Sequence, residues 1–468
     1  MRVAAGAGLC LVAACASVSD RVAEDRSALD ELLAPELAAG LAVPEVDGFD
    51  QRTTVHALLS GGVDEAVAVK VAVLSNGRVR SRLAELGVAS AEVVQAGLVR
   101  NPVFNLQTRI IDGGTQIEAS LMQSFVDVFL LSSRKRTARA RVEAVRVQIA
   151  WELTTLAYDV RRAFVAVHAA NALVDLERAR LAAVGAGQEL MAELHAAGNV
   201  TAARTAHQDL ARARAHADLA RALDRAREAR ESLRAQMGLA GDEPAWELVG
   251  RLELPETAAW PEDVEAAALE ASLDLRAGRA QVRARAQFAE SAAVETMLAS
   301  ASLGLSFERE FDSGEWGVGP ALSASLPLFD TGSARRAASE LELAAELERQ
   351  RQVAVEVRVA ARRLLERERS LTAQLAHFEE VERPAAEALV QAVLQDYNSM
   401  QIGAFDVLDA RTKELESDRA GIETMERAWI ARLGLRELLD GVLREPSRRE
   451  LDAVAELGRR DGRSMEGR

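Results

Sequence analysis

Few side chains in this 468-residue sequence have the types and spacing that chemistry would need. Its six histidines include no pair spaced four apart around an acid, the arrangement of a helical zinc site. No glycine-rich phosphate loop follows an extended segment, no Ser-His-Asp triad can be argued, and the methionines do not cluster. We therefore expect neither an enzyme, nor a metal site, nor a bound cofactor.

Two aspartates, Asp406 and Asp409, stand out because they lie three residues apart where a long helical pattern is interrupted. The interruption is YNSMQIGAFDVLDAR, residues 397–411. Acids at the start of a helix stabilise it by a few tenths of a kcal/mol, so both can be solvated residues of a turn. A ring of carboxylates along an ion pathway is the second interpretation.

The two cysteines, Cys10 and Cys15, both precede the main body of the chain, which therefore has no disulfide and no thiolate metal site. A single charge, Arg2, is followed by an apolar run typical of a secretory signal and too short to span a membrane. The run ends in VAAC, which resembles the lipobox of bacterial lipoproteins. We expect residues 1–14 to be a signal peptide and Cys15 to be acylated. A non-lipidated signal cut at an A-x-A site is the alternative.

The composition favours long helices over ordinary globular domains. Aromatic residues make up only 4%, charged residues make up 28%, and Ala, Glu, Arg and Leu dominate. The formal net charge of −15 argues against a nucleic acid partner. No stretch after the signal has eighteen consecutive apolar residues, the length of a membrane-spanning helix.

The chain reads as one unit used twice, with a period of about 200 residues. After a lipid-anchored segment (15–54) we expect a first repeat over residues 55–250, a second over 251–441, and a polar tail over 442–468. Each repeat has a helix, two extended runs joined by a turn, and a long helical hairpin.

The extended runs predict four strands. The first pair is NPVFNLQTRI and TQIEASLMQSF around DGG, and the second is ASLGLSFERE and VGPALSASLPLF around FDSGEWG, with Trp316 in the turn. Apolar and polar residues alternate, so each strand has one apolar face. Strands of about ten residues suit a tilted transmembrane strand, and a small soluble sheet is the alternative. Because four strands cannot close a barrel, strands in a membrane require several chains.

The helical hairpins are long, since about sixty residues at 1.5 Å each extend about 90 Å. The first turns back within LHAAGNVTAART, residues 194–205, and the second at SMQIG. We expect Pro384 to kink the second descending helix, and Gly185 and Gly187 to weaken the first.

Three stretches carry a family resemblance. LAELGVASAEVVQAGLVRNPVFNL leads a helix into the first strand, and SLPLFDTGSARR joins a strand to a helix through Pro327, Phe329, Asp330 and Gly332. YNSMQIGAFDVLDAR has the Tyr, the Gly and the Asp-Val-Leu-Asp run of a helical hairpin tip. Together they resemble the TolC-like outer membrane efflux proteins, and the similarity runs from about residue 55 to 440.

The resemblance implies a mainly α fold with long antiparallel helical hairpins and a homotrimer whose twelve strands form a β-barrel in the bacterial outer membrane. Its helices would form a tunnel through the periplasm that docks on an adaptor protein and an inner-membrane pump, without catalysis. The residues implied at the tunnel mouth, where three copies of the two aspartates would form a ring, are Tyr397, Gly403, Asp406, Asp409, Gly198 and Asn199.

Three positions depart from the family pattern. Met400 stands where the family commonly has Gly, Arg204 stands where an acid is often found, and the first strand-to-helix junction, SFVDVFLLSSRKR, lacks Pro and Gly. Two other functions stay open from the sequence: a lipid-anchored periplasmic coiled-coil scaffold or adaptor, and an exit duct for protein secretion.

Overall fold

The computed structural model describes most of the chain between residues 18 and 444. The described ranges are 18–33, 51–99, 101–111, 114–124, 126–241, 243–250, 253–255, 259–298, 302–309, 315–323 and 333–444. The predicted signal peptide and Cys15 lie outside these residues, as do most of the predicted tail and the four junction residues Pro327, Phe329, Asp330 and Gly332.

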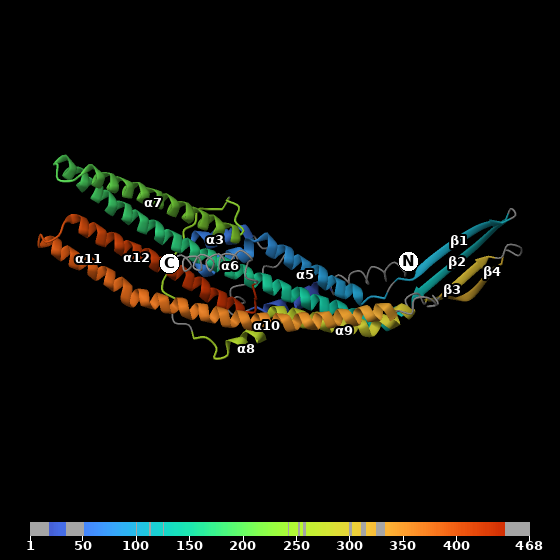
Figure 1. Ribbon diagram of the computed structural model, residues 1–468. Coiled ribbons are helices and arrows are strands. Elements are labelled where there is room, and N and C mark those ends of the chain that lie inside the picture. Colours follow the sequence, from blue (N-terminus) through green and yellow to red (C-terminus); the bar gives the residue numbers. More distant parts are fainter. Residues whose placement is uncertain are drawn as a thin grey trace. The chain divides into compact units, whose positions relative to one another are not determined.

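The chain forms two compact units, each built from segments of both predicted repeats (Figure 1). Unit 1 comprises Met1–Ala42, Gly77–Leu153 and Leu273–Val355, and unit 2 comprises Val43–Asn76, Thr154–Ser272 and Glu356–Arg468. Each repeat has the predicted strand hairpin and long helical hairpin, but two consecutive helices stand directly before the strands where one helix was expected.

Unit 1 contains a four-stranded antiparallel sheet in the order β1-β2-β3-β4 (Figure 1). The strands are β1 (Val103–Ile111), β2 (Gly114–Ser124), β3 (Ser302–Arg309) and β4 (Trp316–Ser323). Both predicted strand hairpins are confirmed, and β2 pairs with β3 to join them. The placement of Trp316 in the turn was wrong, because Trp316 is the first residue of β4 and pairs with Arg309.

The helices of unit 1 connect to this sheet. They are α5 (Gly77–Ala96), α9 (Leu273–Leu298) and the first parts of α6 (Val126–Ala196) and α10 (Ser333–His377). A helix over residues 18–30 lies beside α5, and its Leu29 is fully buried. There the buried Ser90 hydroxyl donates a hydrogen bond to the Asp25 carboxylate at 2.7 Å.

Unit 2 is built around two helical hairpins (Figure 1). The first is the remainder of α6 with α7 (Ala202–Gln236), and the second is the remainder of α10, η1 (Phe378–Glu382) and α11 (Arg383–Asn398) with α12 (Ala404–Leu439). The shorter helices α3 (Gln51–Ser60), α4 (Glu65–Ser75) and α8 (Val264–Ala271) also belong to unit 2.

The two hairpins of unit 2 share a core. Tyr158 and Val165 on α6 pack with Leu433 on α12, and Trp429 covers them. The Tyr158 hydroxyl donates a hydrogen bond to Asp440 at 2.6 Å. Burial raises the pKa of Tyr158, and the negative charge of Asp440 raises it further.

A π-helical turn lies just before Pro384, at which the sequence predicts a kink. The π-helical turn η1 ends at Glu382, and the Arg383 amide donates to the Phe378 carbonyl five residues back. Proline has no N–H for the regular bond to the residue four before it, so the wider turn accommodates it. The expected weakening at Gly185 and Gly187 does not interrupt the first hairpin, because α6 continues through both residues.

Candidate functional site

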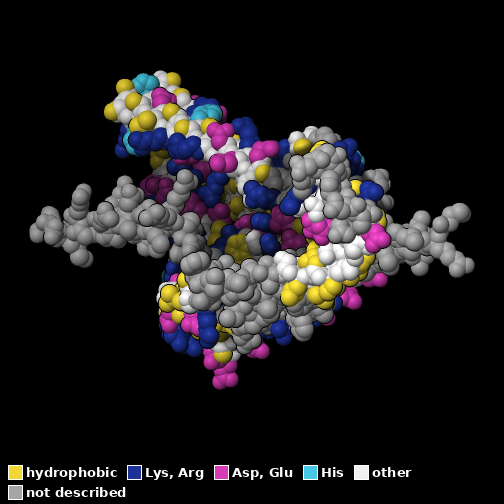
Figure 2. Space-filling view, turned by 90° about the vertical axis from the view of Figure 1, so that its right-hand side faces the viewer, with side chains coloured by type: hydrophobic (Ala, Val, Ile, Leu, Met, Phe, Trp, Pro, Cys, Tyr) yellow, Lys and Arg dark blue, Asp and Glu magenta, His cyan; other side chains and the backbone are white. Residues whose placement is uncertain are grey.

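One face of the sheet in unit 1 is apolar and open. Residues opposite each other on paired strands share a face. The row Phe104, Leu121, Leu305 and Pro320 runs across all four strands, and the next row is Leu106, Ala119, Phe307 and Val318. Phe104 is 64% exposed and Val318 is 63% exposed. Figure 2, which is viewed from the side of the strands, also shows hydrophobic side chains at the surface.

The opposite face of the same sheet is polar or small. Its rows are Asn105, Ser120, Ser306 and Gly319, and then Gln107, Glu118, Glu308 and Gly317. Gln116 donates a hydrogen bond to Glu308 at 2.5 Å on this face. Within the described residues β1 and β4 each pair on one side only, so the sheet has two open edges.

The first hairpin of unit 2 turns at Gly198, which has φ +78°. The Asn199 amide donates to the Leu194 carbonyl at 2.8 Å and the Gly198 amide to the His195 carbonyl at 2.9 Å. These bonds satisfy carbonyls that the end of α6 leaves free, and glycine adopts the left-handed conformation without a steric penalty. The predicted tip residues Gly198 and Asn199 therefore form the turn itself.

The second hairpin repeats this turn with a different residue. The Gln401 amide donates to the Asp396 carbonyl at 3.0 Å, and the Met400 amide donates to the Tyr397 carbonyl at 2.9 Å. Met400 takes the place of Gly198 with φ +57°, and no other described non-glycine residue has a positive φ. The departure at Met400 therefore falls on a position where the turn itself favours glycine.

We expect Met400→Gly to stabilise the second turn by about 1 kcal/mol, because an L residue in the left-handed conformation carries a penalty of this size. Hydrogen exchange of the amides between Gln395 and Asp406 would measure the change. The control is Ser399→Gly, which stands next to it at φ −86° and should not stabilise the turn. Equal exchange in Met400→Gly and the unaltered protein would contradict a strained turn.

The two predicted tunnel-mouth acids have local partners. The Gly403 amide donates to Oδ2 of Asp406 at 2.9 Å, so the Asp406 side chain caps the start of α12 in the way that the acid of a capping box does. Asp409 forms an ion pair with Lys413 at 2.7 Å, and its hydrogen bond raises the pKa of Lys413. Both side chains of that pair are more than half exposed. Arg411, which stands two residues after Asp409, forms an ion pair with Glu414.

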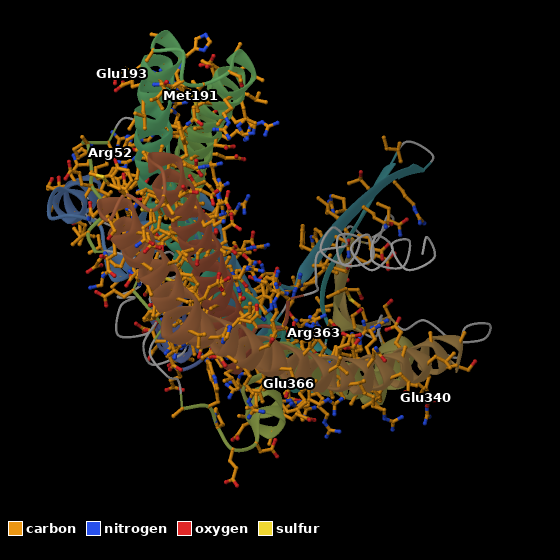
Figure 3. The ribbon with its side chains drawn as sticks, turned by 60° about the vertical axis from the view of Figure 1, so that its left-hand side comes forward. Arg52, Met191, Glu193, Glu340, Arg363 and Glu366 are labelled. Carbon is orange, nitrogen blue, oxygen red and sulfur yellow. The ribbon has the colours of Figure 1, made fainter. Side chains whose placement is uncertain are left out.

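The structure brings the predicted tip residues to one end of unit 2, where both hairpins turn (Figure 1). The ends also touch: a Cβ added at Gly187 on α6 would lie 2.7 Å from Gln208 on α7 and 2.8 Å from Leu408 on α12. Tyr397 is 43% exposed there, so it is not a buried packing residue. Figure 3 shows Met191 and Glu193 on the last turns of α6 at this end.

An ion network between the hairpins was not found from the sequence. Glu177 on α6 is 1% exposed and lies 2.8 Å from Arg419 on α12. Arg180, one turn further along α6, approaches Glu177 at 3.6 Å and pairs with Asp218 on α7 at 2.9 Å. Glu177 therefore connects α6 to α12, and Arg180 extends the network to α7. No local pattern in the sequence distinguishes these residues from the many other Arg and Glu residues.

Within the described residues, no three His, Cys, Asp or Glu side chains are placed to hold a metal ion. His195 lies beside the first turn, with Nδ1 3.1 Å from the Val200 carbonyl. None of the described helices has the length and apolar character needed to cross a membrane.

Comparison with known proteins identifies the fold. No family model and no curated protein matches the chain. CusC, which forms a transmembrane channel, matches with a TM-score of 0.66 and 15% identity over 86% of this chain and 96% of its own. The outer membrane protein VceC of Vibrio cholerae matches with a TM-score of 0.62 and 17% identity over 84% and 98%. The open MtrE outer membrane channel of Neisseria gonorrhoeae matches with 0.64 and 17% over 83% and 89%.

The architecture extends over nearly the full length of these channels, although the sequence identities are low. It is the architecture that the three sequence stretches and their resemblance imply. The chain therefore has the fold of TolC-like outer membrane efflux channels.

Proposed function

We propose that three copies of this chain form the exit duct of a tripartite efflux system in the bacterial outer membrane. The observation that carries the proposal is the sheet of unit 1, with one apolar face, one polar face and two open edges. This alternation is the pattern of a transmembrane barrel whose apolar face contacts lipid and whose polar face lines water. The neighbouring folds, which belong to outer membrane channels, support the same assignment.

The open edges argue for pooling of strands between chains. An unpaired strand edge in lipid leaves backbone groups unsatisfied at several kcal/mol each. If β4 of one chain pairs with β1 of the next, three chains give twelve strands and leave no edge. A periplasmic scaffold would have no use for an open apolar face of this size.

The helical hairpins of unit 2 would form the periplasmic tunnel, and their turns would meet an adaptor protein and an inner-membrane pump. The duct would be passive, since the pump supplies the energy. Acylation of Cys15 after removal of residues 1–14 would add a lipid anchor. The fatty-acid label expected on the protein should then be lost in Cys15→Ala.

The two faces of β1 give a matched test. Leu106 lies on the apolar face and its neighbour Gln107 lies on the polar face. We expect Leu106→Arg to oppose insertion by about 2–4 kcal/mol per chain, because a charge on the lipid face of a barrel is that unfavourable near the bilayer centre. Gln107→Arg should still insert and shift ion selectivity toward anions. Trimer yield in membrane fractions and conductance in planar bilayers would measure both effects.

Normal insertion of Leu106→Arg would argue against a lipid-facing sheet. A detergent-solubilised protein with the mass of one chain and intact strand content would argue against pooled strands. Either result would favour a soluble sheet.

Substitutions of Asp406 and Asp409 test whether the two acids line a tunnel mouth. Asparagine and alanine variants together separate the negative charge of Asp406 from its role as a helix cap. Asp406→Asn keeps an oxygen that can accept from the Gly403 amide, whereas Asp406→Ala removes it. If three copies of both acids ring a pore, Asp406→Asn with Asp409→Asn should reduce cation selectivity and abolish block by divalent cations. Asp406→Ala with Asp409→Ala should in addition loosen the start of α12, by about 1 kcal/mol, because the acceptor of the Gly403 amide is lost.

Single-channel recordings with divalent cations on the periplasmic side would measure these effects. Conductance should be highest in the alanine variant, since the mouth loses both charge repulsion and a helix cap. Unchanged selectivity and block in the double asparagine variant would show that the two acids are solvated helix-start residues.

A further inference from the structure

The start of α6 differs from the start of the corresponding helix in the second repeat. Helix α6 begins at Val126, two residues after the end of β2, with the run VDVFLL, which is apolar except for Asp127. The next ten residues, SSRKRTARAR, carry five cations and no acid, in a chain of net charge −15. Helix α10 starts at Ser333 and carries Glu340 and Glu342 within its first ten residues. In the sequence, five cations without an acid therefore follow the strand of the first repeat, whereas acids accompany the cations of the second.

Three of these cations are free to bind a partner. Lys135, Arg136 and Arg139 are exposed, and none of them forms an ion pair with any residue that the structure describes. Their neighbour Arg141 differs, because it pairs with Glu92 on α5 at 3.2 Å. On α10 the first described cationic side chain, Arg336, pairs with Glu340 at 3.0 Å.

The three side chains lie on one side of the helix. Residues three and four apart on a helix are neighbours, so Arg139 lies close to both Lys135 and Arg136. The stem of Lys135 passes the end of α5, where its Cε lies 3.8 Å from the position of a Cβ at Gly97. We call Lys135, Arg136 and Arg139 the basic patch of α6.

The basic patch lies at the depth of lipid headgroups if the sheet spans a membrane. At 1.5 Å per residue, Lys135 is about 14 Å along the helix from Val126. Helical side chains lean toward the helix N-terminus, which here is the strand side. Long Lys and Arg side chains extend their charges further in the same direction. The charges of Lys135 and Arg136 thus come within about one Debye length, 8–10 Å, of the interface that the strand ends mark, and Arg139 lies one turn further along the helix.

We propose that the basic patch binds the phosphate groups of anionic glycerophospholipids in the periplasm-facing leaflet of the membrane. The patch holds the headgroups at the depth that the strand ends mark. The arrangement is that of a juxtamembrane basic segment, which anionic lipid attracts. This inference rests on the proposed function, because it requires the sheet to lie in the membrane.

The lipid preference of the assembled protein tests the proposal. Full-length protein is reconstituted in mixed phosphatidylethanolamine and phosphatidylglycerol, then extracted, and the lipids retained per trimer are counted by mass spectrometry. The unaltered protein should retain phosphatidylglycerol in excess of its bulk fraction. A charge near an anionic surface contributes about fivefold, so Lys135→Gln with Arg136→Gln and Arg139→Gln should lower this enrichment by about tenfold or more. High salt should lower the enrichment of the unaltered protein toward that of the variant.

The control removes three equally exposed arginines of unit 2 that have no ion pair with a described residue. They are Arg214 on α7 and Arg363 and Arg367 on α10, of which Arg363 is labelled in Figure 3. Arg214→Gln with Arg363→Gln and Arg367→Gln should keep the full enrichment. An equal loss in this control would overturn the proposal, because net charge alone would then explain the preference. Full displacement of the lipid by inorganic phosphate, or retention of lipopolysaccharide in place of phospholipid, would also overturn it.

The proposal and the proposed function fail in different ways. If unaltered and patch variants both form channels in a phosphatidylethanolamine bilayer but retain the same phosphatidylglycerol, the lipid site is wrong and the duct stands. If the unaltered protein forms no channel, and Leu106→Arg enters membranes to the same extent as the unaltered protein, the proposed exit-duct function is wrong.

Discussion

The Glu177→Ala variant is expected to lose about 3–5 kcal/mol of the free energy that holds the helical hairpins of unit 2 together. Glu177 is almost fully buried and carries the negative charge that Arg419 and Arg180 face. Removal of the carboxylate takes away the partner that Arg419 contacts at 2.8 Å, whereas Arg180 keeps its ion pair with Asp218. Loss of one partner of a buried pair is far more unfavourable than loss of an exposed ion pair. Because the carboxylate joins α6 to α12, the two hairpins should separate before either one unfolds.

Asp175→Ala is the matched control for Glu177→Ala. Asp175 lies two residues earlier on α6 and pairs with Arg178 at 3.1 Å, with both side chains more than half exposed. Its loss should change stability by no more than about 1 kcal/mol. Hydrogen exchange along α7 and α12 would compare the variants. Glu177→Leu combined with Arg419→Leu should recover most of the stability, because an apolar pair removes both charges. Similar exchange in Glu177→Ala and Asp175→Ala would contradict a central role for Glu177.

The strands and the hairpin turns could be predicted because their signals are local. Alternation of apolar and polar residues places Leu303 and Leu305 on one face whatever the rest of the chain does. Gly198 and the break at SMQIG mark turns in the same way. Trp316 was misplaced because FDSGEWG offers several turn residues, and only pairing with Arg309 decides where β4 begins.

The contacts of the site could not be predicted, with one exception. The pairing of Glu177 with Arg419 depends on how α6 and α12 pack, and no local pattern selects that pair from many Arg and Glu residues. The partner of Asp409 was within reach of the sequence, because helix geometry favours Lys413 four residues on and disfavours Arg411 two residues on.

A glycine on α12 explains how the π-helical turn before Pro384 fits into unit 2. The Phe378 ring of η1 is 7% exposed and lies against Gly421, where an added Cβ would come within 2.2 Å of Cζ. An aromatic ring is rigid, so it cannot bend aside as a long side chain does. Gly421→Ala should therefore destabilise the second hairpin by about 1–3 kcal/mol through overpacking, and Gly421→Val by more.

Gly434→Ala on the same helix separates this clash from the ordinary effect of removing a helical glycine. A Cβ there would meet Leu364 Cδ2 at 3.5 Å, which is normal contact, so the substitution should stabilise α12 by up to about 1 kcal/mol.

Phe378→Leu with Gly421→Ala should be less destabilised than the sum of the single variants, since the smaller side chain leaves room for the methyl group. Urea unfolding and hydrogen exchange across η1 would measure the cycle. Strict additivity, or stabilisation by Gly421→Ala, would mean that the ring moves into the neighbouring cleft of about 490 Å³ beside His377 and Thr424 without resistance. The π-helical turn would then owe its place to Pro384 alone.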